Sequence, residues 1–267
     1  MPSPGILEIL TLYLLLGALA GVLAGLFGIG GGLVIVPVLY FLFLWQGYPA
    51  EWLMHMAVAS SLATIIFTAL SSTYAHHRRG AVLWQSVYLL APGVALGAVL
   101  GAALADHLAS DVLRIFFGIF QLFVATQLIL VASPSPQRAL PGPVGMVSTG
   151  TGIGTLSTLL GIGGGTFTVP FLLWCNVNIR KAVATSAAIG VPIALVGTAG
   201  LVAVSWGQET LPAGSTGYVY WPAVVAIAAT SVLSAPLGAR LAHTLPVPLL
   251  QRLFAVVVAI VGIRMLV

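Results

Sequence analysis

Long apolar runs separated by short polar stretches occupy most of the chain. Two of these runs extend from Leu10 to Leu26 and from Leu249 to Val267. A helix that crosses a bilayer needs about 20 mainly apolar residues, whereas a membrane β-barrel needs short segments in which apolar and polar residues alternate. The pattern therefore predicts an all-α polytopic membrane protein rather than a barrel.

The apolar runs fall into two similar halves, with about five segments in each at roughly 20 residues per crossing. The stretch 133–143 is rich in Ser and Pro, which is typical of a linker. We therefore expect a first membrane repeat over 1–132 and a second over 144–267. The predicted segments are 6–27, 29–46, 52–75, 82–105 and 112–132, followed by 144–160, 162–177, 182–206, 218–242 and 248–267.

A glycine motif shows that the second half repeats the first. Gly28–Pro37 (GIGGGLVIVP) recurs as Gly161–Pro170 (GIGGGTFTVP). Four further matches follow in the same order in both halves, which indicates a duplication. They pair Ala57–Ser61 with Ala182–Ser186, Gly80–Trp84 with Gly217–Trp221, Gly101–Ala102 with Gly238–Ala239, and Arg114–Phe116 with Arg252–Phe254.

Composition excludes several classes of protein and partner. The chain is 60% hydrophobic and only 5% charged, whereas soluble domains carry about 25% charged residues. The expected surroundings are thus a lipid bilayer. The formal net charge of +4 is spread between apolar runs without a basic patch, so no nucleic-acid partner is expected. Cys175 is the single cysteine, which excludes an internal disulfide and a cysteine metal site, and we predict no metal and no cofactor.

Charges distinguish two arrangements of the repeats. In the first arrangement, each glycine motif is a kink within a single span and the repeats are parallel. In the second, the segments that flank each motif go into the membrane and back out, and the repeats are inverted. The inverted arrangement places Glu8, Glu51, Asp106, Asp111 and Glu209 on one side, and Arg78, Arg79, Arg138, Arg180, Lys181 and Arg240 on the other. Since basic loops stay cytoplasmic, it is favoured, with both termini periplasmic in the inner membrane. Arg114 and Arg264 are exceptions, and we expect Arg114 to snorkel or to pair with Asp111.

The glycine motifs are the main candidate site. Inverted repeats are typical of secondary transporters, whose sites lie near the midplane. A helix that starts after the glycines presents unsatisfied N–H groups and a positive dipole end, which together bind anions. The alternative is close helix packing. A nucleotide loop is excluded because no Gly-Lys-Ser/Thr follows. The predicted binding residues are Gly30, Gly31, Gly32, Gly163, Gly164 and Gly165.

Paired hydroxyls at matching points of the two repeats complete the predicted site. They are Ser60, Ser61, Thr185 and Ser186, which either donate to the anion or bond to helix carbonyls. Weaker candidates are Gln121, Gln127 and Asn176. No carboxylate lies in the middle of a predicted span, so sodium coupling is not expected. We interpret His76–Arg79 (HHRR) as a cytoplasmic basic loop rather than a metal site.

With these motifs in view, the chain resembles the sulfite exporter TauE/SafE family, also called the sulfonate permease group. The resemblance rests on the duplicated glycine motif with its Val-Pro, the Ala-x-Ala-Ser/Thr-Ser element and the closing Gly-Ala…Arg-x-Phe pattern. It implies an inner-membrane carrier of sulfite, sulfoacetate or a related organosulfonate, working by alternating access. An importer of another small organic anion and an anion channel remain alternatives. No nucleophile–base constellation suggests an enzyme, and a homo-oligomer is compatible with the sequence.

Overall fold

The structure is a computed structural model, and it describes residues 5–27, 31–130, 139–241 and 247–267. These ranges contain ten α-helices, one for each predicted apolar segment, with ends that differ from the predicted ones by a few residues. The first half holds α1 (Ile6–Phe27), α2 (Gly32–Trp45), the 3-10 turn η1 (Ala50–Trp52), α3 (Leu53–His77), α4 (Trp84–His107) and α5 (Ser110–Leu130). The second half holds α6 (Pro143–Leu160), α7 (Gly165–Trp174), α8 (Ile179–Val204), β1 (Ser215–Thr216), β2 (Val219–Tyr220), α9 (Trp221–Leu241) and α10 (Val247–Leu266).

Helix length separates full spans from partial ones. Among the described residues, six helical stretches are long and apolar enough to cross a membrane, namely those of α1, α3 with η1, α4, α5, α8 and α9. The helices that follow the glycine motifs are shorter, with 14 residues in α2 and 10 in α7. At 1.5 Å per residue they extend about 21 and 15 Å, less than the roughly 30 Å of a bilayer core. The predicted all-α polytopic class is confirmed, and α2 and α7 are too short to cross.

A small antiparallel hairpin corrects one predicted boundary. The helix expected over 218–242 begins only at Trp221, because β2 pairs with β1 through Thr216 and Val219. Gly217 has a φ of 52°, a left-handed conformation that glycine adopts at little cost. The chain therefore turns back on itself before α9 starts.

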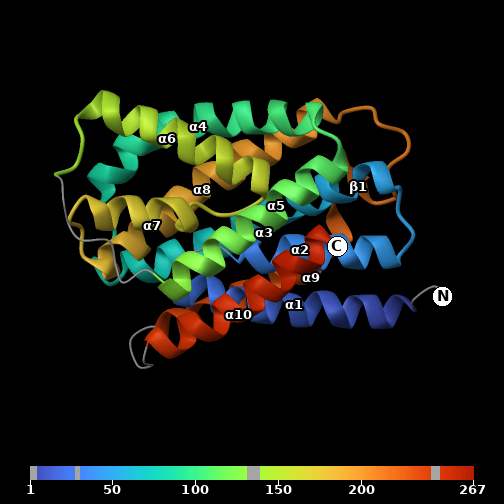
Figure 1. The fold of residues 1–267 in the computed structure, drawn as a ribbon, viewed down its shortest axis with the longest axis horizontal. Coiled ribbons are helices and arrows are strands. Elements are labelled where there is room, and N and C mark those ends of the chain that lie inside the picture. The colour runs from blue at the N-terminus through green and yellow to red at the C-terminus, as the bar shows by residue number, and fades with distance from the viewer. Residues whose placement is uncertain (1–4, 28–30, 131–138, 242–246) are drawn as a thin grey trace.

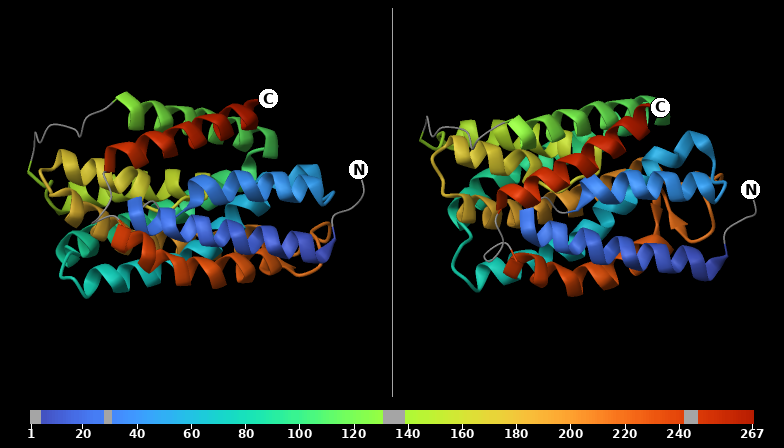
Figure 2. Two further views of the ribbon diagram at one scale, coloured as in Figure 1. Left: turned by 90° about the horizontal axis from the view of Figure 1, so that it is seen from below. Right: turned by 60° about the horizontal axis from the view of Figure 1, so that its bottom comes forward.

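The two halves interlock rather than standing side by side. Helix α1 packs along α9, and α4 packs along α6, so each pair takes one helix from each half. Across the middle, α3 packs on α8, and on the outside α5 packs on α10 (Figure 2). Under the duplication expected from the sequence, α1 would correspond to α6 and α9 to α4, and the two mixed pairs would be equivalent.

Small residues allow these mixed pairs to approach closely. A Cβ atom added to Gly97 of α4 would lie on the carbonyl oxygen of Thr151 in α6, and one added to Gly21 of α1 would lie on Ser234 of α9. Backbones in such direct contact are typical of tightly packed membrane helices. The pairs α1–α9 and α4–α6 are therefore closely packed units that join the two halves.

The ends of the molecule differ in charge. Helix α1 begins and α10 ends at one end, while α6 begins at the opposite end (Figure 1). We call the first the acidic end, because α4 finishes there with Asp106, α5 starts with Asp111, and the loops carry Glu51 and Glu209. At the other, the basic end, lie Arg78, Arg79, Arg180, Lys181 and Arg240. Arg138 is outside the described residues.

The core is built around α3. Of its apolar window, 83% is buried, compared with 39% for α1 and 33% for α5. Its residues Met56 and Val58 are completely buried, and it contacts α2, α8 and α9. The central position of α3 and its partner α8 places their side chains around the glycine turns.

Candidate anion site at the glycine turns

The start of α2 lies directly on the glycine turn of the other half. Gly31 precedes α2 with a φ of 78° and accepts hydrogen bonds from the N–H groups of Val34 and Ile35. A Cβ atom on Gly32 would be 2.5 Å from the carbonyl oxygen of Gly161. The two glycine segments are thus in contact, although Gly30 lies outside the described residues.

The start of α7 faces a cavity instead. Gly164 precedes the helix, and the first backbone bond runs from the N–H of Thr168 to the Gly164 carbonyl at 2.8 Å. The N–H groups before Thr168 therefore have no helical acceptor, and the positive end of the helix dipole lies beside them. Gly163, Gly164 and Gly165 are all buried.

The cavity lies between α3, α8, the end of α1 and the start of α7. On α3 it is lined by the half nearer His77, and on α8 by the half nearer Ile179, so it belongs to the basic half of the molecule. It has room for about one water molecule. Its walls are Ala24, Ile65, Thr68, Ala69, Ser72, Gly163, Gly164, Ser186, Ala187 and Gly190.

Three of the four predicted hydroxyls hold the two halves together. Ser60 accepts a hydrogen bond from the N–H of Tyr220 at 3.0 Å, and Thr185 accepts one from the N–H of Leu83, also at 3.0 Å. The donor Tyr220 directly precedes α9 and the donor Leu83 directly precedes α4, so each bond lies at the start of a long helix. The two bonds would be equivalent under the expected duplication. Ser61 donates to the Gly161 carbonyl at 2.8 Å.

The fourth predicted hydroxyl, Ser186, lines the cavity. It donates to the Val183 carbonyl in its own helix at 2.8 Å. Of the weaker candidates, Gln121 donates to the Leu33 carbonyl at 2.8 Å. Gln127 borders a second hollow between α5 and α7. Asn176 stands in the turn after α7 with a φ of 62°.

Two hydroxyl residues that line the cavity were not among the sequence candidates. Ser72 is 3% exposed, and its Oγ has no hydrogen-bond partner within the described ranges. Thr68 donates to the Thr64 carbonyl at 3.1 Å and lies 3.0 Å from Ser231 Oγ. The spacing of Ile65, Thr68 and Ser72 is that of one helix face, which is the signal that could have found them.

Aromatic side chains fill the acidic end. The buried Tyr218 from the hairpin donates to Asp106 Oδ1 at 3.0 Å, and its ring lies 4.9 Å from that of His55. Tyr220 packs against Tyr48 with ring centres 5.5 Å apart. Burial raises the pKa of the Tyr218 phenol above its usual range, and the Asp106 carboxylate raises it further. The phenol therefore stays a hydrogen-bond donor.

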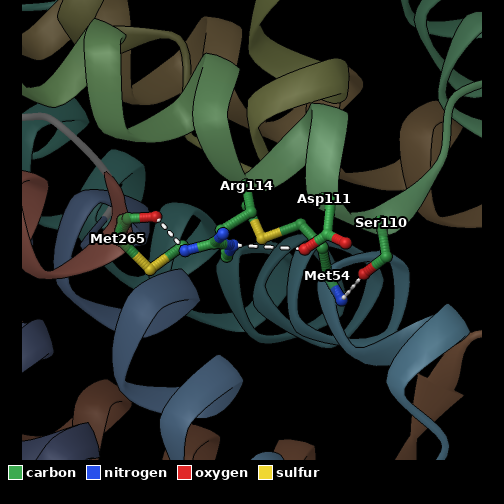
Figure 3. A network of polar contacts seen from close by, with 5 residues as sticks. All are labelled: Met54, Ser110, Asp111, Arg114 and Met265. Carbon is green, nitrogen blue, oxygen red and sulfur yellow. Dashed lines mark hydrogen bonds and ion pairs between the residues drawn. The ribbon is translucent and has the colours of Figure 1, made fainter. Parts of the chain in front are cut away.

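Arg114 is held at the acidic end by two partners (Figure 3). Its Nε is 3.4 Å from Asp111 Oδ1, which confirms the predicted pairing, and its Nη1 donates to the Met265 carbonyl at 2.6 Å. Beside it, Ser110 accepts a hydrogen bond from the N–H of Met54. These contacts tie α5 to α3 and to the end of α10, away from the cavity. No group of residues suited to a metal occurs in the part of the chain that the structure describes.

Comparisons with known proteins agree with this architecture. The family described as sulfite exporter TauE/SafE matches residues 13–265. A probable membrane transporter protein of Haemophilus influenzae is 38% identical over 257 residues, which cover 96% of this chain and 97% of the relative. One from Methanocaldococcus jannaschii is 26% identical, with 97% and 96% covered. A further relative, YunE of Bacillus subtilis, is 26% identical, with 96% and 97% covered. No solved structure matches.

Proposed function

Because the chain belongs to the sulfite exporter TauE/SafE family of membrane transporters, we propose that it carries a small sulfur-containing oxyanion across the inner membrane. Sulfite, sulfoacetate and related organosulfonates are the proposed substrates. The observation that carries the proposal is the start of α7, where buried N–H groups without helical acceptors open onto a cavity that also holds hydroxyl side chains. Such donors replace the water that an anion loses on leaving solution.

The proposed mechanism is alternating access around this site. The acidic end is filled by Tyr48, Tyr218 and Tyr220, while the cavity lies in the basic half. In the proposed cycle the site opens to the basic end from this state and to the acidic end after the aromatic side chains separate. The moving bodies are the mixed units, α1 with α9 and α4 with α6, because their glycine contacts make separation within each unit costly.

The proposed orientation places the basic end in the cytoplasm and both termini in the periplasm. It rests on the segregation of charge between the two ends, since Arg and Lys accumulate in cytoplasmic loops. The opposite directions of α1 and α6 (Figure 1) support an inverted relation between the two repeats. In such transporters the substrate lies at the interface of the repeats, where the glycine turns meet here.

Purified protein in liposomes tests the proposal. Vesicles loaded with sulfite, sulfate, thiosulfate, sulfoacetate or methanesulfonate are assayed for uptake and for exchange of labelled anion. We expect saturable exchange of at least one sulfur oxyanion. Ion current without saturable exchange would instead identify a channel, and failure to move any sulfur oxyanion would rule out the proposed substrate class.

A further inference from the structure

We infer that the anion binds between Ser72 and the start of α7, and that this site selects anions with one negative charge over anions with two. The inference rests on the proposed function and narrows its substrates to monoanions, such as singly protonated sulfite and methanesulfonate. Sulfoacetate, which carries two negative charges at neutral pH, becomes a disfavoured substrate. It assigns the donors to Ser72 Oγ and the N–H of Gly164, which border the same cavity.

Ser72 is the residue that points to a ligand. Its Oγ is buried, lines the cavity and has no hydrogen-bond partner within the described ranges. Buried hydroxyls in native proteins are nearly always hydrogen-bonded, because an unmade bond leaves the cost of lost hydration uncompensated. The cavity has room for about one water molecule in this state, so the anion enters as the site opens to the basic end. The anion would then accept this bond, whereas Thr68 beside it already has partners in Thr64 and Ser231.

Glycine on α8 leaves the second donor uncovered. A Cβ atom at Gly190 would lie 3.6 Å from Ala69 Cβ and 3.8 Å from the Gly164 nitrogen, both ordinary contact distances. An alanine would therefore fit at this position, but its methyl group would occupy the space in front of the α7 start. The glycine keeps that space open for a ligand.

The charge of the cavity walls sets the charge of the ligand. None of the ten described lining residues is ionisable, so the positive field comes from the α7 start, equivalent to about half an elementary charge. The attraction to this field grows in proportion to the ligand charge. The cost of desolvation grows with its square, so a dianion costs about four times as much as a monoanion of equal radius. A site without a cation therefore favours the monoanion.

Cations are present but outside the cavity. Arg78, Arg79, Arg180, Lys181 and Arg240 are exposed at the basic end, where they attract anions of any charge. Along α3, the buried His76 stands one helical turn beyond Ser72 on the same face, whereas Tyr74 between them is exposed. The described part of α1 carries Glu8 and Tyr13, both in its half nearer the acidic end, and α7 carries no titratable residue. A pH experiment therefore needs a variant that removes the titration of His76.

Sulfite provides the test, because it gains a proton near neutral pH and changes from dianion to monoanion. Sulfite–sulfite exchange is measured in liposomes with equal pH on both sides, from below to above neutral. We expect the total sulfite concentration for half-saturation to rise about tenfold per pH unit once the dianion predominates, in His76→Gln as in the parent. A constant or falling value, or a profile that moves in His76→Gln, would overturn the charge selection.

Two variants test the position of the site. Ser72→Ala should raise the half-saturating concentration at least about tenfold through the loss of one hydrogen bond to a charged acceptor. Gly190→Ala should abolish exchange, and both variants should keep the thermal stability of the parent. The matched controls are Ser148→Ala and Gly152→Ala on exposed positions of α6. Parent-like saturation in both cavity variants would overturn the placement. Absence of exchange in the parent protein would instead count against the proposed function.

Discussion

Two glycines of the repeated motif have different surroundings, which their sequences do not reveal. At Gly32 an added Cβ would meet backbone, with the Gly161 oxygen at 2.5 Å and Ile162 Cα at 2.8 Å. At Gly164 it would meet the side-chain ends of Ile193 and Ile189 at 3.0 and 3.1 Å. Backbone atoms cannot move aside as easily as a side-chain methyl group can, so Gly32 should tolerate an added side chain less well than Gly164.

Substitution by alanine should separate these two roles. We expect Gly32→Ala to lower the thermal stability of detergent-solubilised protein by several degrees, because the contact between the halves must open. We expect Gly164→Ala to keep near-parental stability and insertion but to transport poorly, since its methyl group lies at the start of α7. Equal stability in the two variants would contradict this assignment.

Ser61 illustrates a hydroxyl with a structural role. It donates to Gly161, so Ser61→Ala removes a buried bond between the halves and should cost about 1 kcal/mol or more of stability. The half-saturating substrate concentration should change little. The measurement is thermal unfolding in detergent beside Ser148→Ala, whose exposed hydroxyl bonds only within its own helix. Indistinguishable melting of the two variants would contradict the prediction.

At the scale of elements, the pair of α4 and α6 depends on glycine. Gly97→Ala would force the Thr151 carbonyl away and should strongly destabilise the protein. Gly152, on the same pair, has no atom within 4 Å of an added Cβ. Gly152→Ala should therefore raise stability by up to about 1 kcal/mol through helix propensity. Unfolding of both variants in detergent checks the contrast, and a stable Gly97→Ala would show that the pair is loosely packed.

The hairpin before α9 is held by the phenol of Tyr218. Its raised pKa means that folding favours the neutral form, so its contribution is complete below the ordinary phenol pKa of about 10 and decreases as pH rises through the raised value. Tyr218→Phe should cost about 1 kcal/mol through the lost bond to Asp106. Thermal unfolding at several pH values below 9 should show the same difference in melting temperature between the parent protein and Tyr218→Phe. A difference that vanishes in this range would contradict the assignment.

For the whole molecule, the two charged ends predict membrane orientation. In a Cys175→Ser background, Glu209→Cys at the acidic end should react with an impermeant maleimide added to intact cells. Arg79→Cys at the basic end should react only after the membrane is permeabilised. Both side chains are exposed. The reverse labelling pattern would invert the proposed orientation.

The membrane class could be predicted from local sequence alone, and the expected duplication rests on comparing two short motifs. Apolar run length depends only on local composition, and motifs such as Gly28–Pro37 and Gly161–Pro170 can be compared directly. The family follows from the same motifs and is confirmed over residues 13–265. The sequence did not predict the hairpin before α9. Its residues Tyr218, Val219 and Tyr220 have high β-propensity, but they continue into an apolar helix without a polar break.

The roles of the hydroxyls depended on what faces them from another helix. Sequence comparison pairs Ser60 with Thr185, but their partners Tyr220 and Leu83 each come from the opposite repeat. Ser72 corresponds to Gly197 at the offset that pairs Ser60 with Thr185, so the duplication did not mark it. A hydroxyl becomes a ligand candidate when packing buries it without a partner, and that condition arises only from contacts between helices distant in the chain.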